Sequence, residues 1–270
     1  MISPTGKQMA LAPVRPNVGT AAEYRRRLDA LIEEMHRSLA WWLGAAYKQH
    51  QPEISQLAQD ASPARELLAV LAKLKRRWLG KFDELAPDLA RWFAIAAKDR
   101  SDTALRHALR KGGFTVRFRL SRATNDALQA AIGENVALIR SIPERHLAQV
   151  EGAVMRSVQQ GRDLGSLAAE LQQQLGVSKR RAALISRDQN NKATAVIARV
   201  RQQELGITQA RWVHSGAGKE PRPTHVKAGR DGVVFDLATG WYDPHEKRNI
   251  WPGELINCRC VARPVLPGFS

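Results

Sequence analysis

The spacing of apolar residues predicts that most of the chain before residue 207 is helical. Between residues 21 and 39 the apolar side chains recur every three or four positions, which is typical of a helix with one buried face. The same pattern predicts helices over residues 20–50, 62–79, 86–110, 122–142, 143–161, 163–175 and 178–205. Ser62 and Ser178 are suited to cap two of them, and glycines punctuate the later ones. Trp41 and Trp42 are expected to pack in the core.

Two segments depart from this pattern. Residues 1–20 hold three prolines and two glycines without periodicity, which predicts a flexible or surface-draped arm. Residues 114–120 read FTVRFRL, in which apolar and polar side chains alternate. This alternation predicts a half-buried strand or an extended docking segment.

The character of the chain changes after Gly206. Residues 207–270 are rich in glycine, proline and tryptophan and show no helical period, which predicts a compact β-rich module. Asp231-Gly232 is a hairpin signal, Pro252-Gly253 is a second turn, and three tryptophans are expected to form a small core: Trp212, Trp241 and Trp251.

The expected fold class is therefore mainly α: an elongated helical body with a small C-terminal α+β module. Its expected parts are an arm (1–20), an N-terminal helical region (21–130), a second helical region (131–206) and the module (207–270). No apolar run reaches the roughly 18 residues that a membrane-spanning helix needs, and the first residues lack the apolar core of a signal peptide. A cytoplasmic origin is therefore expected.

The net charge points to a polyanionic partner. The chain has 42 Lys and Arg against 26 Asp and Glu, a formal charge of +16. Such an excess favours proximity to DNA or RNA, because cationic side chains gain affinity by displacing condensed counterions. A basic surface without a nucleic-acid partner is the alternative.

The two cysteines are candidates for metal binding. Cys258 and Cys260 are too close in sequence for an unstrained disulfide, so reduced thiols are expected. With His225 and His245 they provide the ligand types that zinc prefers, and Asp231 or Asp243 could complete the set instead. Two interpretations stay open: a structural zinc that staples the module, or thiols buried as small apolar side chains beside a hydrogen-bonded His225.

Four stretches, in order, resemble the head-morphogenesis family typified by the F protein of phage Mu. They are NVALIRSIPERHLAQVEGAV, RAALISRDQNNKATAVIARVRQQELGITQARWVHS, PRPTHVKAGRDG and WPGELINCRCVARPV. The resemblance covers about half the chain. It implies a minor capsid protein, present in few copies in the virion and needed for head assembly or for handling packaged DNA. The implied partners are the portal protein, the scaffold or major capsid protein and double-stranded DNA, with no required cofactor and no membrane.

The basic residues near the start of the last predicted helix are the candidates for contact with DNA or the portal: Lys179, Arg180, Arg181, Arg187 and Lys192. They do not share one helix face, so a solvated basic helix is the alternative.

A catalytic role is not expected, since the sequence contains neither a phosphate-binding glycine loop nor a nucleophile elbow. The alternative is a metal-free nuclease or toxin-like effector in which His214 and His225 exchange protons and Arg222 stabilises the phosphate charge. The family pattern has an acidic residue just before its Arg-Pro-x-His motif, and in this chain Glu220 is the candidate for that position.

Overall fold

A computed structural model of the chain describes residues 9–49, 63–160, 164–216, 218 and 220–266. The chain forms two compact units. One, here the mixed unit, combines Met1–Ala21, Arg91–Gly133 and Ser186–Ser270, and the other, the helical unit, combines Ala22–Ala90 and Glu134–Ile185.

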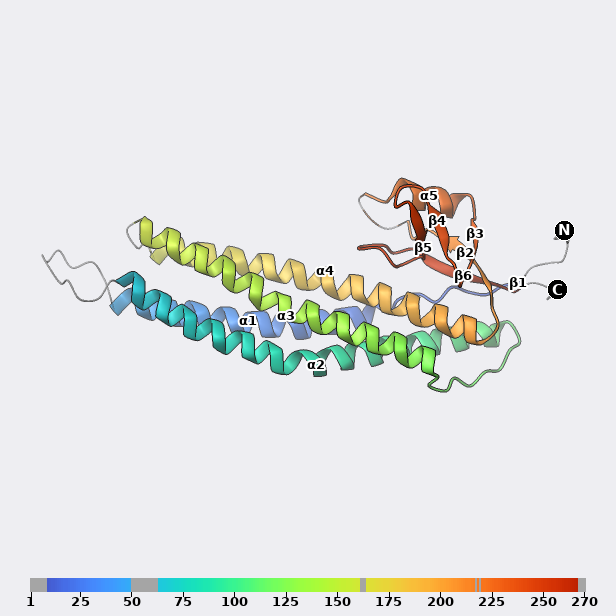
Figure 1. Cartoon of the computed structure of the whole chain (residues 1–270), viewed down its shortest axis with the longest axis horizontal. Helices are drawn as coiled ribbons and strands as arrows, with labels where there is room; N and C mark the ends of the chain where they lie inside the picture. The colour runs from blue at the N-terminus through green and yellow to red at the C-terminus, as the bar shows by residue number, and fades with distance from the viewer. Residues whose placement is uncertain (1–8, 50–62, 161–163, 217, 219, 267–270) are drawn as a thin grey trace, which may run out of the picture. The chain divides into compact units, whose positions relative to one another are not determined.

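Four long helices account for most of the described chain, which confirms the mainly α class. They are α1 (Val18–Gln49), α2 (Pro63–Lys111), α3 (Arg122–Gln159) and α4 (Leu164–Glu204), drawn in order from blue to orange in Figure 1. The divisions between the two units fall inside all four of these helices, so each contributes residues to both units. No helix among the described residues combines the length and the apolarity needed to cross a lipid bilayer.

The predicted breaks within these helices are wrong. The pairs 62–79 and 86–110, 122–142 and 143–161, and 163–175 and 178–205 each form one helix, with Pro87 and Pro143 inside α2 and α3. Local signals favoured a break, but the buried stripe of α2 continues through the expected gap, where Trp78, Phe82 and Ala86 are at most 1% exposed. Burial of a continuous apolar face outweighs the local cost of a proline or glycine.

The helical unit is held together by apolar stripes. Tyr24, Leu28, Ile32, Met35 and Leu39 of α1 are fully buried, as the periodicity predicts, and the fully buried Leu43 extends this stripe. Ser178 does not cap a helix: it lies inside α4, where its hydroxyl is 2.9 Å from Nδ1 of the buried His146.

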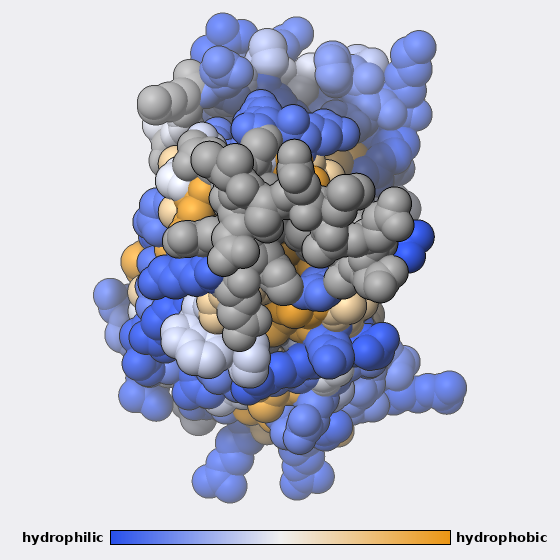
Figure 2. Space-filling model, turned by 90° about the vertical axis from the view of Figure 1, so that its left-hand side faces the viewer, coloured by the Kyte–Doolittle hydropathy of each residue, from blue (hydrophilic) through white to orange (hydrophobic). Residues whose placement is uncertain are grey.

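Trp41 and Trp42 do not pack in the core as predicted. Their side chains are 64% and 44% exposed and meet edge to face, with ring centroids 4.6 Å apart. The prediction fails because both residues lie off the buried stripe of α1, which continues through Leu43 to Tyr47. On the face in Figure 2, hydrophilic residues make up most of the visible surface and apolar residues show between them.

The mixed unit contains the sheet. An antiparallel sheet has the order β1-β6-β2-β3, and β4 pairs with β5 in a separate hairpin. The elements are β1 (Met9–Ala10), β2 (Gln209–Val213), α5 (Pro223–Arg230), β3 (Val234–Asp236), β4 (Trp241–Asp243), β5 (Arg248–Ile250) and β6 (Val261–Leu266). Apart from β1, which is blue, these elements are drawn in orange and red in Figure 1. The expected three-tryptophan core forms around the fully buried Trp212, with Trp241 and Trp251 packed beside it.

Two segments outside the predicted C-terminal module contribute to this core. In the predicted arm, Met9 and Ala10 pair with β6, and Leu11 and Val14 are buried, so the described part of this arm is packed on the sheet. Residues 114–119 keep the predicted alternation of exposure without forming a strand, and Phe114, Val116 and Phe118 pack against the same core. Leu120 breaks the predicted alternation, because its side chain is 62% exposed.

A buried ion pair joins two helices of the mixed unit. The guanidinium of Arg201 donates hydrogen bonds to both carboxylate oxygens of Asp102, at 2.9 and 3.1 Å. It also donates to the carbonyl of Arg119 and lies 3.0 Å from Glu204. Arg201 is 2% exposed, so its partners replace the water that this cation would otherwise bind.

Candidate metal centre

The candidate centre begins with a short helix that the sequence did not predict. Pro223 starts α5, where a missing backbone N–H costs nothing. His225 and Ala228 lie three residues apart and form its buried face. The Asp231-Gly232 turn follows this helix rather than joining two strands, so the hairpin interpretation is wrong, although the turn is present.

The close packing of α5 against the end of β2 requires a glycine at position 229. A Cβ on Gly229 would overlap the Cβ of His214 and lie 2.9 Å from the backbone nitrogen of His214. The helix can therefore approach the end of β2 only because residue 229 has no side chain.

The two cysteines are presented by the turn-rich loop before β6. Pro252-Gly253 forms the predicted turn, with Gly253 at φ +86°. The backbone N–H of Gly253 donates to the Cys258 sulfur at 3.3 Å, and the side chain of Asn191 in α4 donates to the Cys258 carbonyl at 3.1 Å. These bonds fix Cys258 at both its sulfur and its backbone.

His225 faces both sulfur atoms. Its Nδ1 lies 3.5 Å from the Cys258 sulfur and 3.8 Å from the Cys260 sulfur. The three candidate ligand atoms lie within 4.8 Å of one another, and the three residues are 3–4% exposed. Both cysteines are free thiols, as expected. We call this group the Cys2His cluster.

Asp243 lies behind the imidazole. Its Oδ2 is 3.4 Å from Nε2 of His225, and the carboxylate is fully buried at the end of β4. Asp243 accepts hydrogen bonds from the hydroxyl of Thr224 at 3.1 Å and from the backbone N–H of His245 at 2.8 Å. The ring is thereby oriented so that Nδ1, and not Nε2, points at the sulfurs.

The two thiols perturb each other. A hydrogen bond from Cys260 lowers the pKa of Cys258 to about 4. The same bond, reinforced by burial, raises the pKa of Cys260 well above its usual value. The interaction between the two sulfurs therefore shifts their two pKa values in opposite directions.

The other predicted ligands lie elsewhere. The side chain of His245 is 77% exposed and lies 3.6 Å from Glu246, so it is separate from the cluster. Asp231 is exposed and pairs with Arg230. Asp243 contributes, but it contacts the imidazole rather than the sulfurs.

An open hollow of about 580 Å³ borders the cluster. Its described lining includes the three cluster residues, together with His214, Glu220, Arg222 and three further polar or charged residues: Arg187, Asn257 and Arg259. The three residues of the nuclease alternative, His214, His225 and Arg222, therefore border one space. Arg222 also donates to the carbonyl of Ile256 at 3.2 Å.

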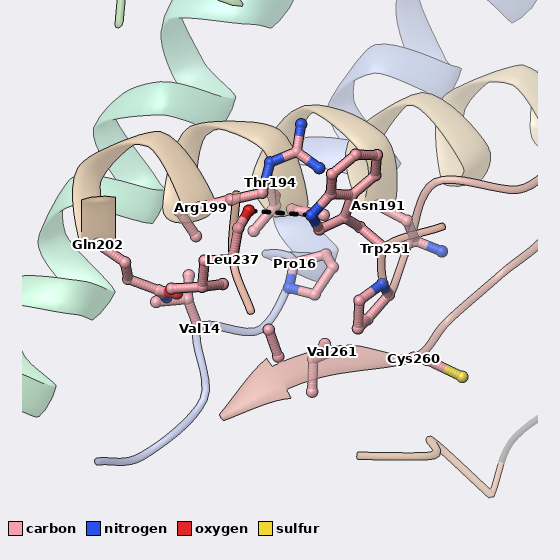
Figure 3. A pocket seen from close by; sticks show the side chains of 14 residues that line it. Val14, Pro16, Asn191, Thr194, Arg199, Gln202, Leu237, Trp251, Cys260 and Val261 are labelled. Atoms are coloured by element: carbon pink, nitrogen blue, oxygen red, sulfur yellow. Dashed lines mark hydrogen bonds between the residues drawn. The ribbon is translucent and has the colours of Figure 1, made fainter. Parts of the chain in front are cut away.

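A second, small cavity lies beside the loop that carries the two cysteines (Figure 3). There the Arg199 guanidinium stacks over the Trp251 ring at 4.2 Å, and the Trp251 indole donates to the Leu237 carbonyl at 3.0 Å. Burial lowers the pKa of Arg199. The Cys260 sulfur points away from this cavity, so the cavity and the cluster are separate features (Figure 3).

The predicted DNA- or portal-contacting residues have varied surroundings. In the helical unit, Lys179 pairs with Glu33, Arg181 donates to the Ser141 hydroxyl at 2.8 Å, and Arg180 is exposed. In the mixed unit, Lys192 lies 3.3 Å from Asp188, and the exposed Arg187 donates to Asn257 at 3.1 Å.

Comparison with known proteins agrees with the sequence resemblance. Residues 148–263 match the family described as "Phage Mu protein F like protein". The matched segment spans the end of α3, all of α4 and most of the C-terminal module, including the Cys2His cluster. The resemblance to the Mu F-like head-morphogenesis family is therefore confirmed over this segment.

A relative from Haemophilus influenzae, described as "Uncharacterized protein", is 27% identical over 262 residues. The alignment covers 94% of this chain and 55% of the relative, so the chain spans about half the length of the curated relative it matches. No solved structure matches the chain.

Proposed function

We propose that this chain is a phage head-morphogenesis protein, a minor virion component that acts at the portal during head assembly and DNA packaging or ejection. The match of residues 148–263 to the Mu F-like family carries the proposal. In this role the protein binds other head components and catalyses no reaction, and it resides in the head interior or near the portal.

The structure supports this proposal because the matched segment forms much of a folded module and is not an isolated helix. The sheet of the module includes residues from both ends of the described chain, since β1 pairs with β6. The module also packs on helical residues of the mixed unit, as the hydrogen bond from Asn191 to Cys258 illustrates. A rigid module of this kind suits docking to a larger assembly.

The charge supports a DNA-facing surface. The formal charge is +16, and Arg180 and Arg187 are exposed cations within the matched segment. We propose that this charge contacts packaged double-stranded DNA without reading its sequence. Affinity for duplex DNA should then fall steeply with salt and vary little between sequences, which a fluorescence titration at several salt concentrations would measure.

Co-purification with the cognate portal and scaffold proteins tests the proposal. The tagged full chain is co-expressed with each partner, captured and analysed by size-exclusion chromatography with light scattering. A stoichiometric complex with the portal is expected. A folded chain that binds neither portal nor scaffold would overturn the assembly role.

The hollow favours one competing function, a nuclease, because it brings His214 and Arg222 beside the Cys2His cluster. Incubation with plasmid DNA and RNA distinguishes the two. Under the assembly proposal the wild type and His214→Ala behave alike and leave both substrates intact. Cleavage that His214→Ala abolishes, with the fold retained, would favour the nuclease.

A further inference from the structure

We propose that the Cys2His cluster binds one zinc ion through Nδ1 of His225 and the sulfurs of Cys258 and Cys260, with the fourth coordination position open to the adjoining hollow. The proposal concerns a site within the chain and does not depend on the proposed role in head assembly.

The ligand spacing fits zinc. Zinc bonds of about 2.3 Å to sulfur and about 2.0–2.1 Å to nitrogen, in a tetrahedron, place neighbouring ligand atoms roughly 3.5–3.8 Å apart. The two nitrogen–sulfur separations are 3.5 and 3.8 Å, and all three ligand atoms lie within 4.8 Å of one another. Zinc can therefore be bound with little movement of the backbone.

His225 has a carboxylate behind its ring, as metal-binding histidines commonly do. A ligating histidine commonly directs its second nitrogen at a carboxylate, which fixes the ring and raises its basicity. Oδ2 of the fully buried Asp243 lies 3.4 Å from Nε2 of His225, while Nδ1 faces the sulfurs. Nε2 makes no hydrogen bond within the usual distance, and metal binding at Nδ1 would leave the ring proton on Nε2, facing Asp243.

The open position follows from the donor set. Within the described residues, the group of mutually close metal-binding atoms consists of these three alone. The same three residues line the hollow, together with His214 and Glu220. Three protein ligands and one exchangeable water would complete the tetrahedron.

Such an ion would join segments that are distant in the sequence. His225 lies on α5, Cys258 lies in the loop after β5, and Cys260 directly precedes β6. The strands of this region are three to six residues long, so a metal cross-link can contribute much of their stability.

Elemental analysis of the full chain, purified under reducing conditions, is the first test. One zinc per chain is expected in the wild type and in the control His245→Ala, which removes an exposed histidine from the same module. His225→Ala, Cys258→Ser and Cys260→Ser should each lose the metal. Asp243→Asn should retain the ligands but weaken zinc binding by about 10–100-fold. Zinc absent from reduced wild type, even after incubation with zinc salts, would overturn the site.

A second measurement avoids dependence on variants that fail to fold. Titration of wild-type thiols with a mercurial reagent, in the presence of a zinc indicator, should release one zinc as the two thiols react. Thiols that react without zinc release would contradict the proposal.

Cobalt substitution tests the open position. Bound cobalt should show sulfur-to-metal charge-transfer bands, and added azide or imidazole should shift its d–d bands. A tetrahedral spectrum that neither ligand changes would show that the fourth position is closed, and would overturn that half of the proposal.

Discussion

The two units bury different kinds of side chain. In the helical unit the core is a set of apolar stripes, and its buried polar groups are neutral: Asn135, His146, Ser157 and Ser178. Every buried carboxylate and guanidinium among the described residues belongs to the mixed unit: Asp102, Asp188, Asp243 and Arg201. The Cys2His cluster lies there too.

The two units are therefore stabilised in different ways. Apolar stripes tolerate substitution of similar volume, whereas a buried charge depends on each of its partners. The mixed unit should therefore be the more sensitive to single changes.

The largest expected effect is at the buried ion pair. Arg201→Met should lower the free energy of unfolding by about 3–5 kcal/mol, because the buried Asp102 loses both hydrogen bonds from the guanidinium and is left with Lys98, 3.4 Å from its Oδ2. Denaturant unfolding measures the change. The matched control is Arg26→Met in the helical unit, where the side chain of Arg26 is 75% exposed and pairs with Glu23. Equal stability of the two variants would remove the distinction between the units.

The next effect is a pH dependence in the helical unit. Burial, followed by the proximity of His36, lowers the pKa of His146 to about 4 from its ordinary 6.5. Between pH 4 and 6.5 the imidazole of His146 therefore binds a proton in the unfolded chain but not in the folded chain. Stability is unaffected above pH 6.5 and falls as the pH drops toward 4, by up to about 3 kcal/mol.

Unfolding of the wild type and of His146→Asn across this pH range measures the contribution. The variant should lose most of the pH dependence between 6.5 and 4 that the wild type shows. If both proteins have the same pH profile, His146 is not the group responsible.

The two smallest expected changes in stability come from glycine-to-alanine substitutions and are opposite in sign. Gly229→Ala should destabilise the mixed unit by about 1–3 kcal/mol, because the new methyl group would meet the backbone of His214. Gly80→Ala should stabilise by about 0.5–1 kcal/mol, since Gly80 is an exposed helical residue with no atom within 4 Å of an added Cβ. Thermal unfolding of both variants decides, and a stabilising Gly229→Ala would show that the close approach is not required.

Periodicity predicted what depends on a repeated local pattern. The stripe from Tyr24 to Leu39 and the mainly α class followed from apolar spacing. The joined helices did not, because prolines and glycines are local signals while a continuous buried face is a tertiary property. The packing of Leu11 and Val14 depends on strand pairing between the two ends of the chain, which spacing alone does not encode.

The cluster was predictable in part for a chemical reason. Cys258, Cys260 and His225 share an affinity for soft metal ions, so ligand type alone nominated them. Ligand type could not show that Asp243 lies beside His225 while His245 is exposed, because the direction of each side chain depends on the β4–β5 hairpin. The predicted helix over residues 178–205 did not indicate the contacts of Arg199 and Arg201, and only the fold shows that Arg199 stacks on Trp251 and that Arg201 is ion-paired with Asp102.

The central claim is that the chain works in the phage head at the portal. Quantitative mass spectrometry of heads purified from the phage that encodes it, with and without the portal protein, tests this claim most directly. The account predicts the chain in few copies in portal-containing heads and its loss from heads that lack the portal. Its absence from both, or equal amounts in both, would contradict the account.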